Sequence, residues 1–378
     1  MELERVPAGV RGCCAALRGA GYQAYLVGGC VRDLLLGRTP TDYDAATDAL
    51  PEQVAALFPR TVPTGLKHGT VTVLTGDGPV EVTTFRRDGD YLDGRRPESV
   101  AFGTDLREDL ARRDFTVNAM ALGADGAVVD PWGGREDLAA GLIRCVGEPE
   151  RRFGEDGLRL LRAVRFAAQL GFSLEVRTAA AIPACAAGAG RVSAERIRVE
   201  VEKILVSDRP RWAQALVDWG LLARWLPARR CPDLSPLEGC RAAPIPRWAV
   251  FCKLTGFPIG ALPVETRLRR AVEGALAEPE PRTGADWRRL LARRGPEAAQ
   301  AAAALWGGEA ALEAVLPDPW RMEDLALRGR DLQTLGLQGE EIGAALARIR
   351  AHVLERPEDN RREILLALAA GAERNERE

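Results

Sequence analysis

Lysine and histidine are nearly absent from this sequence of 378 residues. Lysine stands only at positions 67, 203 and 253 and histidine only at 68 and 352, so all but three of the 52 basic residues are arginine. Two histidines, and eight cysteines that form no CxxC pair, argue against a zinc site. A planar guanidinium suits bidentate contacts to phosphates and bases. A GC-rich coding bias explains the arginine excess equally well, and the formal net charge of −2 gives no polybasic signal for nucleic acid.

Signals for secretion and membrane insertion are missing as well. The amino terminus has no basic region followed by an apolar core, which argues against a signal peptide. No apolar run reaches the roughly 20 residues that cross a bilayer. Scattered cysteines fit free thiols in a reducing compartment. With 46% hydrophobic and 28% charged residues, the composition is that of a globular protein of two or more domains, and we expect it in the cytoplasm.

The most informative stretch, residues 25–44, reads as strand, glycine turn, helix, loop and strand. Asp42 and Asp44 close it, and side chains two apart lie on the same face of a strand. Two adjacent carboxylates repel each other, and a hard divalent cation with oxygen ligands relieves the repulsion. The glycine pair that begins at Gly28 lets the backbone approach a ligand closely, and Arg32 follows at a helix start. Metal carboxylates beside such a turn indicate nucleotidyl or phosphoryl transfer.

The rest of the first 140 or so residues predicts an α+β head domain. Two strand patterns, Gly69–Leu74 and Val80–Phe85, are separated by a turn of hairpin length, which predicts an antiparallel sheet with flanking helices. Residues 86–103 are polar, charged and contain glycine, and we expect them to form a mobile loop. From about residue 136 the strand patterns nearly vanish, so an all-α neck, body and tail should follow.

Several motifs carry a family resemblance. They are VGGCVRDLLLGR at 27–38 with Asp42 and Asp44, RRDFTVNA at 112–119, DPWGG at 130–134, GEDGLRLLRAVRF at 154–166 and VSAERI at 192–197. Further pieces are LRGRDL at 327–332, EIG at 341–343 and NRR at 360–362. In this order they resemble class II CCA-adding tRNA nucleotidyltransferases and bacterial poly(A) polymerases, which form one family.

The resemblance implies a domain order and an activity. The expected parts are a catalytic, metal-binding nucleotidyltransferase head over 1–140, a helical neck that recognises the base over 141–205, and a helical body and tail that bind tRNA over 206–378. The implied reaction adds C, C and A stepwise to the 3′ end of tRNA from CTP and ATP. It uses Mg²⁺ and no nucleic-acid template, and it releases pyrophosphate. Neither a membrane nor an obligate protein partner is implied.

Two segments bear on the choice among family members. PTGLKHGTV at 63–71 resembles the CCA-adding version of this region more than the poly(A) polymerase version. DGRRP at 93–97 belongs to a loop that enzymes adding only CC lack, which disfavours that activity. Addition of the terminal A alone, and poly(A) synthesis, remain as alternatives. A switch from C to A needs a pocket that changes shape, and the loop 86–103 is the expected element.

The resemblance also assigns roles to single residues. Asp42 and Asp44 are the catalytic carboxylates that hold the ions of a two-metal transfer. Nucleotide binding falls on seven residues: Gly29, Arg32, Arg113, Asp156, Arg159, Arg162 and Arg165. Glu81, on a predicted strand, is a candidate third metal-site carboxylate, and a solvated residue of the strand face is the alternative. Arg112 and Asp114 are expected to form only local ion pairs.

Asp156 and Arg159 are the expected selectors of the base. They lie three apart on a predicted helix and are therefore neighbours on its surface. An ionised aspartate only accepts hydrogen bonds, and arginine only donates them. Cytosine and adenine each present an amino donor beside a ring-nitrogen acceptor, whereas guanine and uracil reverse this order. The pair would accept CTP and ATP and would leave buried groups unpaired with GTP or UTP. The alternative is an ordinary surface ion pair.

Arg162 and Arg165 continue the spacing of three. Each step of three turns about 60° around a helix, so the series from Asp156 to Arg165 winds halfway round it. We expect the first three side chains near the nucleotide and Arg165 toward phosphate or a neighbouring element. The helix that carries Arg196 and Glu200 should brace the neck.

The predicted body and tail contain most of the eight tryptophans. They also contain three arginine clusters, at 267–270, 288–294 and 361–362. Each tryptophan is expected in the core. The arginine clusters are either solvated helix faces or phosphate contacts to double-stranded RNA, which the family grips by shape.

Overall fold

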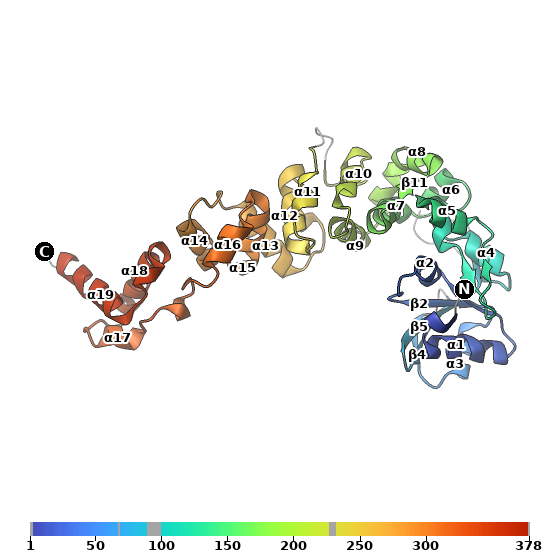
Figure 1. The fold of residues 1–378 in the computed structure, drawn as a ribbon, viewed down its shortest axis with the longest axis horizontal. Coiled ribbons are helices and arrows are strands. Elements are labelled where there is room, and N and C mark those ends of the chain that lie inside the picture. The colour runs from blue at the N-terminus through green and yellow to red at the C-terminus, as the bar shows by residue number, and fades with distance from the viewer. Residues whose placement is uncertain (1–2, 67–68, 89–99, 227–231, 377–378) are drawn as a thin grey trace. The chain divides into compact units, whose positions relative to one another are not determined.

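The computed structural model describes residues 3–66, 69–88, 100–226 and 232–376. The chain divides into two compact units, Met1–Arg229 and Arg230–Glu378 (Figure 1). Within the described segments, no helix combines the length and the apolar character needed to cross a membrane.

A seven-stranded sheet forms the centre of the head, with strand order β3-β4-β5-β2-β1-β8-β9. Its strands are β1 (Ala24–Val27), β2 (Tyr43–Thr47), β3 (Thr61–Gly65), β4 (Thr70–Thr75), β5 (Gly78–Thr84), β8 (Ala121–Leu122) and β9 (Val128–Val129). Neighbouring strands run antiparallel except β2 and β5, which are parallel. The predicted α+β head and its β4–β5 hairpin are confirmed. The parallel contact of β5 with β2 adds a long-range pairing that turn spacing does not reveal.

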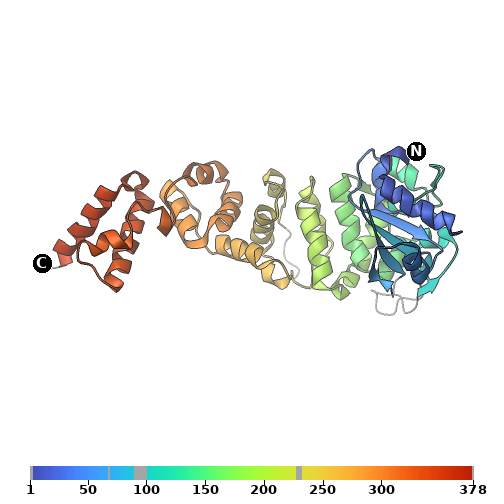
Figure 2. The ribbon, with the colours of Figure 1, turned by 90° about the horizontal axis from the view of Figure 1, so that it is seen from below.

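Helices cover both faces of this sheet. α1 (Ala8–Gly19) and α3 (Pro51–Leu57) pack on one face, and Figure 2 shows α1 lying along the strands. α1 buries Val10, Cys13, Cys14 and Leu17, the spacing of an amphipathic helix. α4 (Leu106–Ala111) belongs to the other face, where Val27, Ala46, Phe85 and Leu110 form part of a buried cluster. α2 (Gly29–Leu35) connects β1 toward β2.

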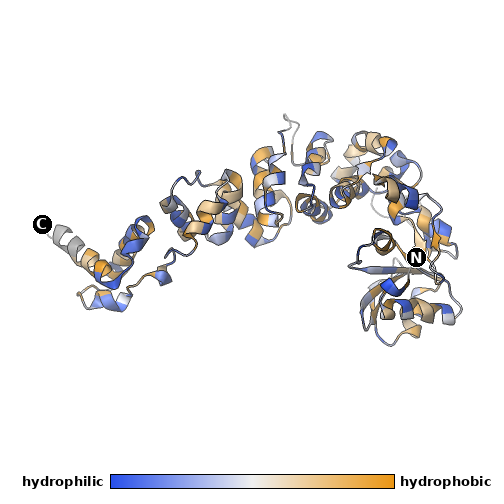
Figure 3. Ribbon diagram, in the orientation of Figure 1, coloured by the Kyte–Doolittle hydropathy of each residue, from blue (hydrophilic) through white to orange (hydrophobic). Residues whose placement is uncertain are grey.

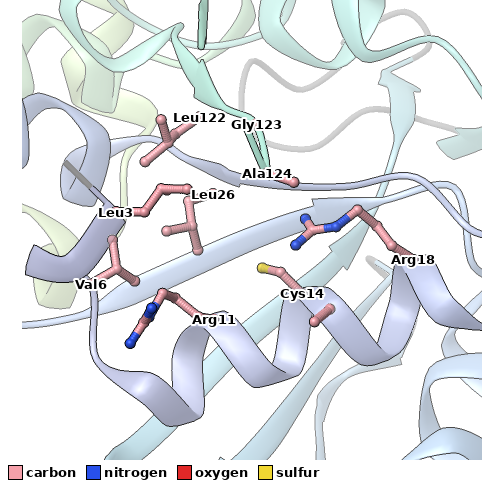
Figure 4. A pocket seen from close by; sticks show the side chains of 10 residues that line it. Leu3, Val6, Arg11, Cys14, Arg18, Leu26, Leu122, Gly123 and Ala124 are labelled. Carbon is pink, nitrogen blue, oxygen red and sulfur yellow. The ribbon is translucent and has the colours of Figure 1, made fainter. Parts of the chain in front are cut away.

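A cavity of about 240 Å³ lies between α1, the 3₁₀ helix η1 (Leu3–Arg5) and strands β1 and β8. Figure 4 shows Arg11 and Arg18 extending from α1 near Leu26 and Leu122. Because side chains alternate along a strand, Leu26 faces opposite to Val27 and to Asp44, the register partner of Val27. The cavity is therefore on the sheet face away from the predicted metal carboxylates.

The segment 86–103, predicted to be a loop, begins and ends as strand. β6 (Arg86–Asp88) pairs antiparallel with β7 (Val100–Phe102). The loop prediction is therefore wrong at both ends, because the charged sequence masks two short extended segments that satisfy each other's backbone groups. The remainder of the predicted loop, 89–99, lies outside the described residues, as do Lys67 and His68 of the 63–71 motif.

Helices dominate the rest of the first unit, as predicted. They are α5 (Gly134–Ala140), α6 (Pro149–Glu155), α7 (Leu158–Leu170), α8 (Val176–Cys185), α9 (Ala194–Leu205) and α10 (Ala213–Asp218). One exception to the all-α neck is a parallel pair of two-residue strands, β10 (Leu142–Ile143) and β11 (Ser173–Leu174). Gly141 and Gly171 end α5 and α7 in the left-handed conformation. After each helix the chain continues in an extended conformation, and the two extended segments pair.

The described residues of the second unit form helices and connecting segments. The helices are α11 (Pro236–Gly239), α12 (Pro244–Thr255), α13 (Thr266–Leu276), α14 (Gly284–Arg294), α15 (Pro296–Trp306), α16 (Glu309–Val315), α17 (Gly329–Gln333), α18 (Glu340–Glu355) and α19 (Arg362–Glu376). Hydrophobic and hydrophilic residues alternate along them (Figure 3). Trp248 and Trp287 are buried, as expected of core tryptophans. Arg288, from a predicted surface cluster, is also buried; it pairs with Asp318 and donates to the Leu354 carbonyl.

Candidate active site

Asp44 lies at the edge where β1 and β2 meet the glycine turn, and two further carboxylates, Glu81 and Asp42, are near enough to raise its pKa. Asp44 on β2 and Glu81 on β5 are register partners, so their side chains share the face covered by α4. Asp42 precedes β2 and is exposed. Burial raises the pKa of the Asp44 carboxyl to about 6, with Glu81 and Asp42 adding to the rise and Arg113 opposing it. The site thus carries the charge repulsion that the sequence predicts.

The donor set fits Mg²⁺ in the manner usual for nucleotide enzymes. Among the described residues no three Asp, Glu, His or Cys side chains converge into a ready-made metal cage. Mg²⁺ commonly takes only one or two protein carboxylates and completes its octahedron with water and substrate phosphates. Asp42 and Asp44 supply that partial set. Glu81 lies beside Asp44 in the sheet but is exposed, so its role as a third ligand stays a prediction.

Cation binding is expected to weaken as the pH falls. Asp44 must be ionised to coordinate a cation, and its raised pKa of about 6 makes protons compete in the range from pH 7.5 to pH 5. We expect Mg²⁺ affinity, measured by titration calorimetry, to drop about tenfold across this range. The variant Asp44→Asn serves as control, since it should bind weakly at both values. Equal Mg²⁺ affinity of the unaltered protein at both pH values would contradict the assignment of Asp44 as a metal ligand.

The turn after β1 brings an arginine over these carboxylates. Gly28 has a φ of +76°, a conformation that favours glycine. A Cβ added to it would lie 2.9 Å from Arg113 Nη1 and 3.4 Å from Asp44 Oδ2. Arg113 follows α4, 69 positions downstream of Asp44 in the chain, and within the described part of the chain its buried Nε has no hydrogen-bond partner. The glycine, the aspartate and the arginine come from three different elements and lie so close together that a side chain at the glycine position would not fit.

A second network links α2 to the helices of the neck. Arg32 Nη1 donates to Asn118 Oδ1 at 2.7 Å, and Asn118 Nδ2 donates to Asp114 Oδ1 at 3.2 Å. Arg162 Nε donates to Asp114 Oδ2 at 2.7 Å. Burial alone would raise the pKa of Asp114, but Arg162 and the other donors lower it to about 2. The expectation of only local ion pairs is wrong for Asp114, because the partner lies 48 residues away.

Asp156 does not lie on the same helix as Arg159. It is extended, between α6 and α7, and its Oδ1 accepts the Leu158 N–H at 3.0 Å. An aspartate that bonds a backbone N–H two residues on competes with helix formation, so the helical prediction is wrong at this position. A Cβ on Gly157 would lie 2.3 Å from the Gly188 carbonyl oxygen, which fixes the junction. Asp156 pairs instead with Arg196 of α9 at 2.8 Å.

Arg159 is held at the junction of head and neck. It is buried, pairs with Glu155 and donates to the carbonyls of Arg152 at 2.9 Å and of Arg112 at 3.0 Å. The guanidinium therefore has a fixed position, set by partners on α6 and at the end of α4. Glu155 was not expected to contribute. The sequence does contain a signal for this ion pair, because a glutamate four positions before an arginine has the spacing of an ion pair on a helix.

Arg165 is directed toward α9. Its Nε donates to Glu200 Oε2 at 2.6 Å, and both side chains are buried. The guanidiniums of Arg32, Arg162 and Arg165 also lie 5.3, 5.2 and 3.8 Å from the centre of the Phe166 ring. Phe166 was missed at the level of sequence, although a single aromatic ring at the end of an arginine-rich motif is a candidate cation–π platform.

Comparisons with known proteins show which families and structures this chain is similar to. Residues 24–144 match a family model for the poly A polymerase head domain, and residues 171–230 match one for a probable RNA and SrmB-binding site of polymerase A. A crystal structure of the Bacillus stearothermophilus CCA-adding enzyme in complex with CTP is similar over 98% of each chain, with 34% identity and a TM-score of 0.80. A Thermotoga maritima CCA-adding enzyme complexed with tRNA shares the fold, at 22% identity and a TM-score of 0.71 over 98% of this chain and 97% of that one.

Curated relatives match over a shorter span. The CCA-adding enzyme of Geobacillus thermodenitrificans is 50% identical over 242 residues, which are 62% of this chain and 60% of that protein. The CCA-adding enzyme of Bacillus subtilis is 55% identical over 186 residues, 49% of this chain and 47% of that protein. The matched part thus spans between about half and three fifths of the length of these relatives.

Proposed function

This chain belongs to the CCA-adding enzyme family, and we propose that it adds the 3′-terminal C, C and A to tRNA, stepwise, from CTP and ATP. The reaction uses no nucleic-acid template and releases pyrophosphate. The observation that carries the proposal is the convergence of Asp44, Gly28 and Arg113 in a chain that is similar to a CTP-bound CCA-adding enzyme over 98% of its length.

Each group at the turn has a chemical task in this proposal. Mg²⁺ held by Asp42 and Asp44 would activate the 3′-hydroxyl of the RNA and stabilise the leaving pyrophosphate. Arg113 places a positive charge beside the glycine turn, where it offsets the charge of the triphosphate. Gly29 and Arg32 provide the backbone and a second guanidinium at the start of α2. Arg162 and Arg165 lie over the Phe166 ring, and their nucleotide contacts are carried over from the family resemblance.

Base choice is assigned to Asp156 and Arg159. A carboxylate accepts several hydrogen bonds, so Asp156 can receive an amino group of cytosine or adenine while paired with Arg196. Arg159 is fixed by Glu155 and two carbonyls, which keeps its donors in place before the nucleotide arrives. The head over 1–140 then performs transfer, the neck over 141–205 reads the base, and the body and tail over 206–378 hold tRNA in the cytoplasm.

The deciding experiment measures which nucleotides the protein adds to tRNA lacking one, two or three terminal residues, with Mg²⁺ present. The proposal expects C, C and A in order and a stop after A. Incorporation of ATP alone, onto tRNA ending in CC, would narrow the activity to A addition. Long A-tails on unstructured RNA would instead indicate poly(A) synthesis, and no incorporation of either nucleotide would refute the proposal.

Replacing Asp156 by Ala is expected to remove the preference for CTP and ATP. The acceptor for the exocyclic amino group is lost, so kcat/KM for both nucleotides should fall about 100-fold, while that for UTP and GTP changes little. Arg196→Met is the matched control, because it breaks the same ion pair without removing the carboxylate. A control variant that lost selectivity equally would show that the ion pair, and not Asp156 itself, selects the base.

A further inference from the structure

Asp109 is a carboxylate without a role in the mechanism so far, and it lies between two arginines at the end of α4. Its side chain is only 1% exposed. Oδ1 accepts from Arg112 Nε at 3.0 Å and Nη2 at 2.8 Å, and Oδ2 accepts from Arg113 Nη2 at 3.4 Å. Burial acts to raise the pKa of Asp109, but the two guanidiniums outweigh it and the pKa is lowered. A buried, ionised carboxylate thus fixes two consecutive side chains.

Arg112 and Arg113 share the Asp109 carboxylate unequally, and this decides how strongly each of their charges is paired. Arg112 makes the two short contacts and neutralises Asp109, whereas Arg113 makes a single long one. Arg113 is therefore paired only weakly with Asp109, and the other end of its guanidinium lies at the Gly28 turn beside Asp44. The buried Nε of Arg113 has no hydrogen-bond partner among the described residues, and its Nη1 lies at the Gly28 turn. Arg113 is therefore oriented by Asp109 but keeps charge and donors for an anion.

The same short segment also holds the neck. The carbonyl of Ala111 accepts from Arg152 Nη2 at 2.7 Å, and the carbonyl of Arg112 accepts from Arg159 Nη2 at 3.0 Å. The last carbonyls of a helix have no partner within it and attract cations. Since the Arg112 side chain is anchored on Asp109, the carbonyl that meets Arg159 is anchored as well. Residues 109–113 thus contact the glycine turn through a side chain and the neck through the backbone.

We propose that Asp109 is a positioning residue that sets two nucleotide-binding arginines at once, Arg113 beside the phosphates and Arg159 beside the base. The inference rests on the function proposed above and adds a residue that touches neither metal nor nucleotide. It explains why a costly buried charge is retained here, since an apolar residue would fill the space but would hold neither arginine.

The test is Asp109→Asn, which keeps the shape of the side chain and removes its charge. We expect KM for CTP and for ATP to rise about tenfold each, with a smaller change in kcat and an unchanged KM for tRNA. Direct titration of ATP with Mg²⁺ should show the same loss of affinity. Asp137→Asn is the matched control, because Asp137 is also buried and also pairs with an arginine, Arg144. It should lower thermal stability and leave both nucleotide KM values unchanged.

A double-variant cycle separates positioning from simple stabilisation. In an Arg113→Ala background, Asp109→Asn should add only the smaller effect transmitted through Arg159, so the two changes should be clearly non-additive in nucleotide affinity. Asp109→Glu, which restores the charge, should recover part of the affinity. Additive effects, or an Asp109→Asn variant that loses stability but binds nucleotides normally, would overturn the proposal. If the unaltered protein adds no nucleotide yet Asp109→Asn weakens ATP binding, the proposed function fails and the positioning role stands.

Discussion

Asp44→Asn is expected to abolish nucleotide incorporation and to make the metal-free protein more stable. The activity should fall by roughly 10³-fold or more, because a cation at this carboxylate supplies several kcal/mol of transition-state stabilisation. The opposite effect on stability follows from the raised pKa of Asp44, about 6 against an ordinary 3.8. A group of the folded state that binds protons more tightly than in the unfolded state is destabilising once it is ionised.

The stability of the folded state should therefore depend on pH. The folded state binds more protons than the unfolded state between pH 3.8 and about pH 6, so stability falls as the pH rises through this window and the cost is complete above it. At pH 7.5, Asp44→Asn should gain about 1–3 kcal/mol in the free energy of unfolding. Well below pH 3.8 the gain should vanish, because Asp44 is then protonated in both states.

Asp42→Asn is the matched control for this prediction. It removes the neighbouring metal carboxylate from an exposed position, so activity should be lost to a similar degree with much less gain in stability. Thermal unfolding in EDTA and nucleotide incorporation with Mg²⁺, measured on both variants, give the comparison. A fall in the stability of Asp44→Asn at pH 7.5 would show that the buried, ionised Asp44 carboxylate is not a cost to the fold.

Asp114→Ala should have the largest effect on folding. Removing this carboxylate leaves Arg162 without its ion pair, and the Phe115 N–H and Asn118 Nδ2 without their acceptor. We expect a loss of about 2–4 kcal/mol, since a broken buried pair leaves a charge uncompensated. Asn118 also receives the hydrogen bond of Arg32, so Arg32 and Arg162, which are both assigned to the nucleotide, lose their orientation. Nucleotide affinity should fall with stability.

Urea unfolding followed by circular dichroism tests this second prediction. The pKa of Asp114 is lowered to about 2, so its contribution is present above the ordinary pKa of 3.8 and is lost as the pH falls toward 2. The difference between the unaltered protein and Asp114→Asn should therefore be smaller at pH 3 than at pH 7. A difference that stayed constant would mean that packing, and not charge, accounts for the role of Asp114.

Local patterns in the sequence predict the head well, and they fail where distant segments meet. The strand that carries Asp44 and the glycine turn at Gly28 are set by neighbouring residues, and both agree with the structure, whereas Asp42, predicted on the same strand, precedes it. The partner of Asp114 lies 48 residues away, and no spacing rule connects it to Arg162. Asp156 deviates for a different reason: its side chain competes for a backbone N–H, and this competition overrides the helical periodicity on either side.

The parallel pairing of β2 with β5 has a consequence for the order in which the protein assembles. β4 and β5 form a hairpin from residues close in the chain, which closes quickly, whereas β5 reaches β2 only across the intervening helix and strands. Asp44 and Glu81 are far apart until that docking step, so their mutual repulsion arises late and opposes the docking itself. A divalent cation bound near Asp44 would offset this repulsion and so would favour the docking of β5 on β2.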